Sequence, residues 1–179
     1  RNPYPAKLSL ETYGQHGYLY AAISRACEDL SALDLKLIKG KGKKAQEIDD
    51  HEVLDLLENP STHSDGFLLR EQLCLDLIMS GSCYLLLLGL NEKRPDSIVR
   101  LHPAEVRIVT DEKTGIIGYE HTSNGQSVLY PPSRVLVARN ASYATGPKGL
   151  YGTGAIESLS RELQADLSVK NETAIQAKN

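Results

Sequence analysis

The sequence predicts an α+β fold in which N-terminal helices pack with a mainly antiparallel β-meander, and a long helix follows. Three observations favour this class. Apolar side chains recur at helical spacing over residues 14–30 and 65–80, the pattern changes to short strand-like runs after Gly81, and helical spacing returns from about Gly154. Helices and strands therefore follow one another in blocks, whereas a parallel α/β fold alternates them.

The N-terminal part is predicted to be mainly helical. Residues 14–30 place apolar side chains on one helical face, and residues 33–37 then alternate as a half-buried strand does. A short helix is expected over residues 51–57. It should end before Pro60, because a proline disfavours helical backbone in the residue before it. The next helix is expected to begin after Asp65, a favourable N-cap.

Strand-like segments follow Gly81, which is expected to close that helix. Residues 84–88 form an apolar run bounded by glycines, which is typical of a strand buried on both faces. Turns are expected at residues 111–115 and at Asn124-Gly125, since Asn and Gly both tolerate positive φ in tight hairpins. The remaining strands are expected at residues 98–101, 106–110, 116–120, 127–130 and 134–138.

The 179 residues are expected to be one piece of a larger protein, because the chain starts without Met and stops within a helical pattern. We expect a helix–strand arm over residues 1–50, helices with the β-meander over 51–139, and a connector with a long helix over 140–179. A chain of this length buries roughly 70% of its unfolded surface, which is enough for a true core.

Charge and composition exclude several classes of protein. The net charge of −3 and the pI near 6.0 argue against a sequence-independent grip on nucleic acid, which needs a dense basic patch. The basic cluster Lys36–Lys44 is interpreted as a solvated turn, and its role stays open. The longest apolar run, Cys83–Leu88, is far shorter than the ~20 residues of a membrane span, so no membrane partner is expected.

The cysteines do not form a recognisable site. Cys27, Cys74 and Cys83 are odd in number and lack the spacing of zinc ligands. Two of them lie in apolar sequence, where free cysteine behaves as a small hydrophobic residue. We expect all three to be free and structural in a reducing compartment, and we expect no metal and no cofactor.

No catalytic motif emerges, so the chain is not expected to be an enzyme. His51-Glu52 lacks the second histidine of a metalloprotease helix, and no G-x-S-x-G nucleophile motif occurs. The loop Gly149–Gly154 precedes a helix and could present backbone N–H groups to a phosphate. It lacks the Lys-Ser/Thr of a P-loop, and the favoured interpretation is that its glycines allow a tight helix entry with Thr153 as the cap. A cytosolic α+β ligand-binding or enzymatic domain that uses this loop remains the alternative.

An ordered set of short segments resembles the portal proteins of tailed bacteriophages. The match covers most of residues 50–170. Ser82-Cys83 stands where the family has Asn-Ala, and Gly154-Ala155 stands where it has Ser-Pro. The segments that carry the resemblance are Leu56-Leu57-Glu58-Asn59-Pro60, Phe67, Gly81-Ser82-Cys83-Tyr84, Leu101-His102-Pro103-Ala104-Glu105-Val106, Val135-Leu136-Val137-Ala138-Arg139 and Gly149-Leu150-Tyr151-Gly152.

The resemblance implies a structural subunit of a dodecameric ring at one capsid vertex. Such a ring nucleates head assembly, docks the large subunit of the terminase, and contacts capsid, scaffold and head–tail connector proteins. Double-stranded DNA passes through its channel without sequence specificity. The resemblance implies a location in the virion, and in the host bacterial cytoplasm during assembly. This piece would be the wing, and its last helix would lead toward the stem.

The candidate contact residues lie on that last helix. Their helical spacing places them along one side, and large exposed apolar patches mark contact sites on soluble proteins. They are expected to meet the missing stem or a neighbouring subunit, or to pack within the subunit itself. These residues are Ile156, Leu159, Leu163 and Leu167.

Overall fold

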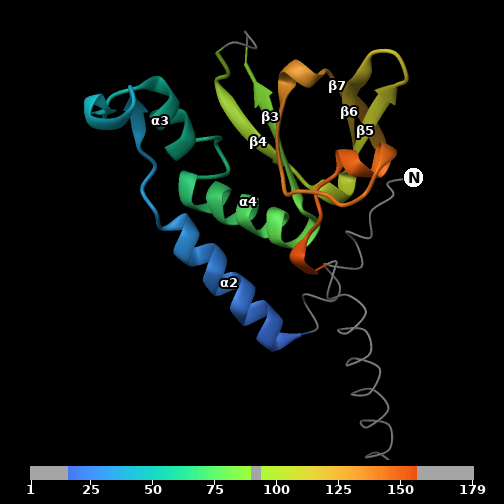
Figure 1. The fold of residues 1–179 in the computed structure, drawn as a ribbon, viewed down its shortest axis with the longest axis horizontal. Coiled ribbons are helices and arrows are strands. Elements are labelled where there is room, and N and C mark those ends of the chain that lie inside the picture. Colours follow the sequence, from blue (N-terminus) through green and yellow to red (C-terminus); the bar gives the residue numbers. More distant parts are fainter. Residues whose placement is uncertain (1–15, 90–93, 157–179) are drawn as a thin grey trace, which may run out of the picture.

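The computed structural model describes residues 16–89 and 94–156. Helix α2 (Gly17–Ser31) packs beside α4 (Gly66–Ser80), and the short helix α3 (Glu52–Glu58) lies near the start of α4 (Figure 1). Two three-stranded sheets follow, and all their strand pairs are antiparallel. The α+β class predicted from the sequence is therefore confirmed.

The first sheet has strand β3 (Ser82–Leu88) at its centre, between β4 (Ser97–Leu101) and β8 (Val135–Arg139). Strand β3 is buried along most of its length, as its apolar run predicts. One of its faces meets α4 through Leu69, Leu87 and Ile98. Strand β3 therefore joins the helical layer to the rest of the molecule.

The second sheet is a meander of β5 (Val106–Asp111), β6 (Gly115–Ser123) and β7 (Gln126–Tyr130). The predicted single meander is thus two sheets, because β8 does not continue beside β7 but returns to pair with β3. A second core lies between the sheets. Its buried residues are Tyr84, Leu86, Leu101, Val106, Tyr119 and Val135.

Local signals placed most turns correctly. The Asp65 carboxylate accepts a 2.8 Å hydrogen bond from the Leu68 N–H and caps α4, while Gly81 ends this helix with φ +74°. Asn124 and Gly125 both have positive φ, as the β6–β7 hairpin requires. Asp111 accepts bonds from the N–H groups of Lys113 and Thr114 in the β5–β6 turn.

The prediction of a strand over residues 33–37 was wrong. The strand is β1 (Leu37–Lys39), and it pairs with β2 (Gln46–Ile48), which the sequence reading missed. Leu33 and Leu35 are exposed, so their alternation with polar residues does not reflect a half-buried strand. We name the hairpin from Leu37 to Ile48 the ribbon.

An ion pair fixes α4 to the first sheet. The Arg100 guanidinium on β4 donates two hydrogen bonds to the Asp76 carboxylate on α4, at 2.7 Å and 2.5 Å. Asp76 is buried, with 4% of its surface exposed. Burial raises the pKa of the Asp76 carboxyl, and the Arg100 charge offsets part of that rise. Two hydrogen bonds therefore hold the ion pair together at a buried site where an unpaired charge would be unfavourable.

We expect Arg100→Met to lower the free energy of unfolding by about 3 kcal/mol at neutral pH, because it leaves a buried carboxylate unpaired. The Asp76 pKa, already raised in the fold, rises further without Arg100. A carboxyl group whose pKa is raised in the folded state lowers the free energy of unfolding at pH values above that pKa. This loss shrinks as the pH falls through the folded-state pKa, because the buried carboxyl then becomes neutral. Urea unfolding at pH 7.5 and at about pH 5 should show a smaller loss at the lower pH.

The matched control is the double variant Asp76→Leu with Arg100→Met, which removes both charges. Its loss should be smaller than that of Arg100→Met and independent of pH, because no unpaired charge remains buried. Equal losses for Arg100→Met at both pH values would show that Asp76 is not the titrating group.

Candidate functional site

Three glycines bring the end of α4 against the connector loop over residues 149–154. A Cβ atom on Gly152 would overlap the Gly81 carbonyl oxygen, and a Cβ on Gly154 would overlap the Met79 carbonyl oxygen. A Cβ on Gly81 would in turn meet the backbone of Thr153. We name Gly81, Gly152 and Gly154 the glycine junction, because only residues without side chains allow this approach.

Hydrogen bonds close the junction. The Gly152 N–H donates to the Ser82 hydroxyl at 2.8 Å, and the Asn140 N–H donates to the Gly81 carbonyl at 2.8 Å. The Asn140 side-chain amide also donates to the carbonyls of Leu77, at 2.9 Å, and Thr153, at 3.3 Å. Asn140, which directly follows strand β8, thus bonds to both sides of the junction.

The geometry explains the glycine-rich loop without a phosphate. The Gly152 N–H, which a phosphate would need, already bonds to Ser82. Two carbonyls of the same loop, those of Gly149 and Leu150, accept bonds from the Arg139 guanidinium at 3.1 Å and 2.6 Å. The loop is therefore organised for backbone packing, and nothing in this geometry favours the phosphate-binding alternative.

The contact candidates are only partly described. Ile156 is helical and buried, with 3% of its surface exposed, and it packs with Ile23, Cys27 and Met79 between α2 and α4. The start of the apolar stripe thus packs within the subunit. Leu159, Leu163 and Leu167 lie outside the described residues, so their part in assembly stays a prediction.

His51, His102 and His121 have structural partners, and the three cysteines form no disulfide. The Nδ1 atoms of His51 and His102 accept bonds from the N–H groups two residues later, at 3.1 Å and 3.2 Å, and His121 pairs with Glu105 at 3.0 Å. Cys27 and Cys83 are buried, Cys74 is half-buried, and all three are free. Within residues 16–89 and 94–156, no three His, Cys, Asp or Glu side chains converge as metal ligands would.

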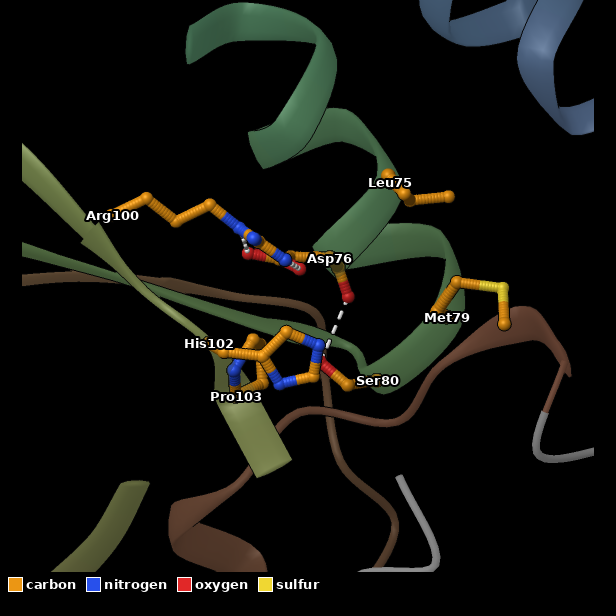
Figure 2. A pocket seen from close by; sticks show the side chains of 7 residues that line it. All are labelled: Leu75, Asp76, Met79, Ser80, Arg100, His102 and Pro103. Carbon is orange, nitrogen blue, oxygen red and sulfur yellow. Dashed lines mark hydrogen bonds and ion pairs between the residues drawn. The ribbon is translucent and has the colours of Figure 1, made fainter. Parts of the chain in front are cut away.

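A small hollow lies where α4 meets the end of β4 (Figure 2). Asp76 and Ser80 reach it from the helix, and Arg100 and His102 reach it from the sheet. Its volume is about 20 Å³, which suits roughly one water molecule. Burial, with a smaller contribution from the Arg100 charge, holds the pKa of His102 below its usual value. The hollow is too small for a metabolite.

The basic cluster Lys36–Lys44 belongs to the ribbon. The Lys36 ammonium pairs with Glu47 at 2.8 Å, and Lys39, Lys41 and Lys44 are exposed. The expected solvated turn is present, but it joins two paired strands. The closely spaced Gly40 and Gly42 were the signal that could have suggested a hairpin turn, whereas Gln46-Glu47-Ile48 carries no alternating pattern that would have revealed the second strand.

We expect Gly152→Ala to lower the free energy of unfolding by about 1–3 kcal/mol or more, since the new methyl group forces the junction apart. The Ser82 hydrogen bond to the Gly152 N–H is lost with it. The control is Gly17→Ala at the start of α2, where a Cβ would meet nothing within 4 Å. This control should be neutral or slightly stabilising, because alanine favours helix. Similar thermal melts for the two variants would contradict the junction's importance.

None of the helices described is long and apolar enough to cross a membrane. Among curated proteins, none matches the chain. Solved structures do match its fold. In the neck of the empty GTA particle, computed with C6 symmetry, one chain is 16% identical at a TM-score of 0.85, and the match covers 99% of this chain and 47% of that one.

Two further structures agree. They are the neck of the native GTA particle, computed with C12 symmetry, and the virion of the native gene transfer agent, each at a TM-score of 0.81 and 16% identity. The match again covers 99% of this chain and 46% of each relative, so the chain spans about half the length of the structures it resembles.

A protein-family model also matches the chain. The model described as phage portal protein matches residues 18–179, which include both sheets, the glycine junction and the helices packed on them. The chain belongs to the phage portal protein family.

Proposed function

We propose that this chain is the wing part of a portal subunit, and that the complete subunit forms a closed dodecameric ring at one vertex of a phage-like capsid. The observation that carries the proposal is the family match over residues 18–179. The fold likeness to chains in particle necks with C6 and C12 symmetry supports a ring. The subunit's work is structural, so no residue is assigned to catalysis.

The more detailed roles that we propose follow from the position of such a ring at a capsid vertex. It nucleates head assembly, docks the terminase during DNA packaging, and joins the head–tail connector proteins afterwards. It acts in the virion, after assembly in the host cytoplasm. Double-stranded DNA passes through the channel without sequence-specific contacts. The net charge of −3 suits a conduit, because a surface without a dense basic patch does not retain the polymer that moves past it.

The arrangement of the described residues suits a stiff wing. Helix α4 is fixed to the first sheet by the Asp76–Arg100 pair and to the connector by the glycine junction. The connector leads into Ile156, which is anchored between α2 and α4. A load on the residues that follow Ile156 would therefore reach the whole wing through packed backbone rather than through a free linker.

We predict that the full-length protein forms closed rings, and that replacing both Leu163 and Leu167 with Asp weakens them. Two carboxylates on an apolar stripe would have to be desolvated at any contact the stripe makes. Light scattering at several protein concentrations measures assembly. Thermal melts of the same samples separate a lost contact from a loss of fold.

The matched control places two acidic residues off the stripe, as Ala165→Asp with Ser168→Asp. This control should assemble almost as the parent does, because helical spacing places both positions away from the apolar residues. A full-length protein that remains monomeric at every concentration would refute the proposed function.

A further inference from the structure

The two three-stranded sheets have four outer edges, and two of these are capped. On β4, the Ile98 N–H donates to the Pro60 carbonyl at 2.6 Å. On β5, the Ile108 N–H donates to the Tyr151 hydroxyl at 3.0 Å. The remaining edges are the outer sides of β7 and β8. At the end of β8, Arg139 binds the carbonyls of Gly149 and Leu150, which keeps the connector beside it.

The β7 edge lacks the usual protection against pairing with another strand. Its sequence from Gln126 to Tyr130 contains no charged residue and no proline, and its pairing with β6 has no bulge. Val128 is 48% exposed and Leu129 is 54% exposed. A regular edge without charge or proline, and with exposed apolar side chains, is a template for strand addition.

The hairpin register shows which backbone groups face outward. Ser123 and Gln126 flank the two-residue turn and form a hydrogen-bonded pair, so the pairs alternate from there along β6 and β7. Ser127 and Leu129 therefore direct their N–H and C=O groups away from β6. Among residues 16–89 and 94–156, no group bonds to them on that side.

The ribbon is the complementary element. It is a separate two-stranded sheet with three residue pairs, and such a ribbon is marginally stable by itself in water. Ile38 on its first strand is 58% exposed. In Figure 1 the ribbon is the blue-to-cyan segment beside α3, at the end of the molecule opposite β7. The ribbon and the outer edge of β7 therefore cannot meet within one chain.

The distribution of charge also favours contact between the ribbon of one copy and β7 of another. From Lys36 to Ile48 the sequence has five lysines and one glutamate, a formal charge of +4. From Glu105 to Tyr130 it has four acidic residues and two basic ones, a formal charge of −2. Opposite charges on the two ends guide one copy toward the next and disfavour contact between like ends.

We propose that the ribbon of one copy of this chain adds to the outer edge of β7 in the next copy, extending the β5–β6–β7 sheet across the subunit boundary. A contact between opposite ends is heterologous, and repetition of a heterologous contact closes a ring when the rotation allows it. The inference rests on the proposed function, since it names the surfaces through which that ring is built.

The backbone test uses Ser127→Pro in the full-length protein, with Ser127→Ala as its matched control. Both variants lose the 2.7 Å contact between the Ser127 and Thr122 hydroxyls, but only proline also removes the outward N–H. We expect Ser127→Pro to weaken each interface roughly twofold to tenfold, the effect of one lost hydrogen bond. Ser127→Ala should assemble as the parent does, and equal assembly by both variants would contradict the inference.

The contact test pairs cysteines across the boundary. Ile38→Cys is combined in turn with Ser127→Cys, Val128→Cys and Leu129→Cys, and oxidised rings are separated on a denaturing gel without reductant. We expect a ladder of linked subunits from at least one combination. The control combines Ile38→Cys with Tyr18→Cys on α2, which is also exposed but not on the proposed boundary, and should give no ladder.

The outcomes separate the two proposals. Rings that form without any ladder would overturn the ribbon–β7 contact and leave the proposed function intact. A full-length parent protein that forms no ring would contradict the proposed function, and the inference with it. Rings that give the ladder only with cysteines at positions 127–129 would support both.

Discussion

The backbone contact between Gly81 and Gly152 joins three parts of the molecule at one point: the end of α4, the start of β3 and the connector over residues 140–154. Because Ser82 and Asn140 bond across the contact, its geometry fixes how β3 leaves the helix and how the connector arrives. Both sheets depend on this arrangement. Strand β3 carries the first sheet directly, and it carries the second through the shared core around Tyr84 and Val106.

The second constraint is electrostatic and acts on the same helix. Asp76 is buried at a cost, and the two hydrogen bonds from Arg100 offset that cost only while α4 keeps its place against β4. A buried ion pair is weak evidence for stability, but it penalises every displaced arrangement of the helix. Helix α4 is thus held at its C-terminal end by the close backbone contact at Gly81 and further along by the Asp76–Arg100 ion pair.

The sequence predicted what depends on local chemistry. The N-cap Asp65, the left-handed Gly81, the Asn124-Gly125 hairpin and the buried run of β3 were all placed correctly, since each is specified by neighbouring residues. Pairing between distant segments was not accessible in the same way. The return of β8 to β3 and the pairing that forms the ribbon depend on tertiary contacts, and the pattern over residues 33–37 was misleading because Leu33 and Leu35 are exposed. The glycines of the junction were visible, but their close approach to Gly81 was not.

The central claim is that this wing is a rigid unit of a closed ring, built through contacts between opposite ends of the chain. A cryo-EM reconstruction of the assembled full-length protein tests it most directly. We expect a closed ring in which each wing keeps the Gly81–Gly152 contact and a strand from the neighbouring subunit lies beside β7. A reconstruction without ring closure would contradict the proposed function. One in which the outer edge of β7 faces solvent in every subunit would contradict the proposed contact.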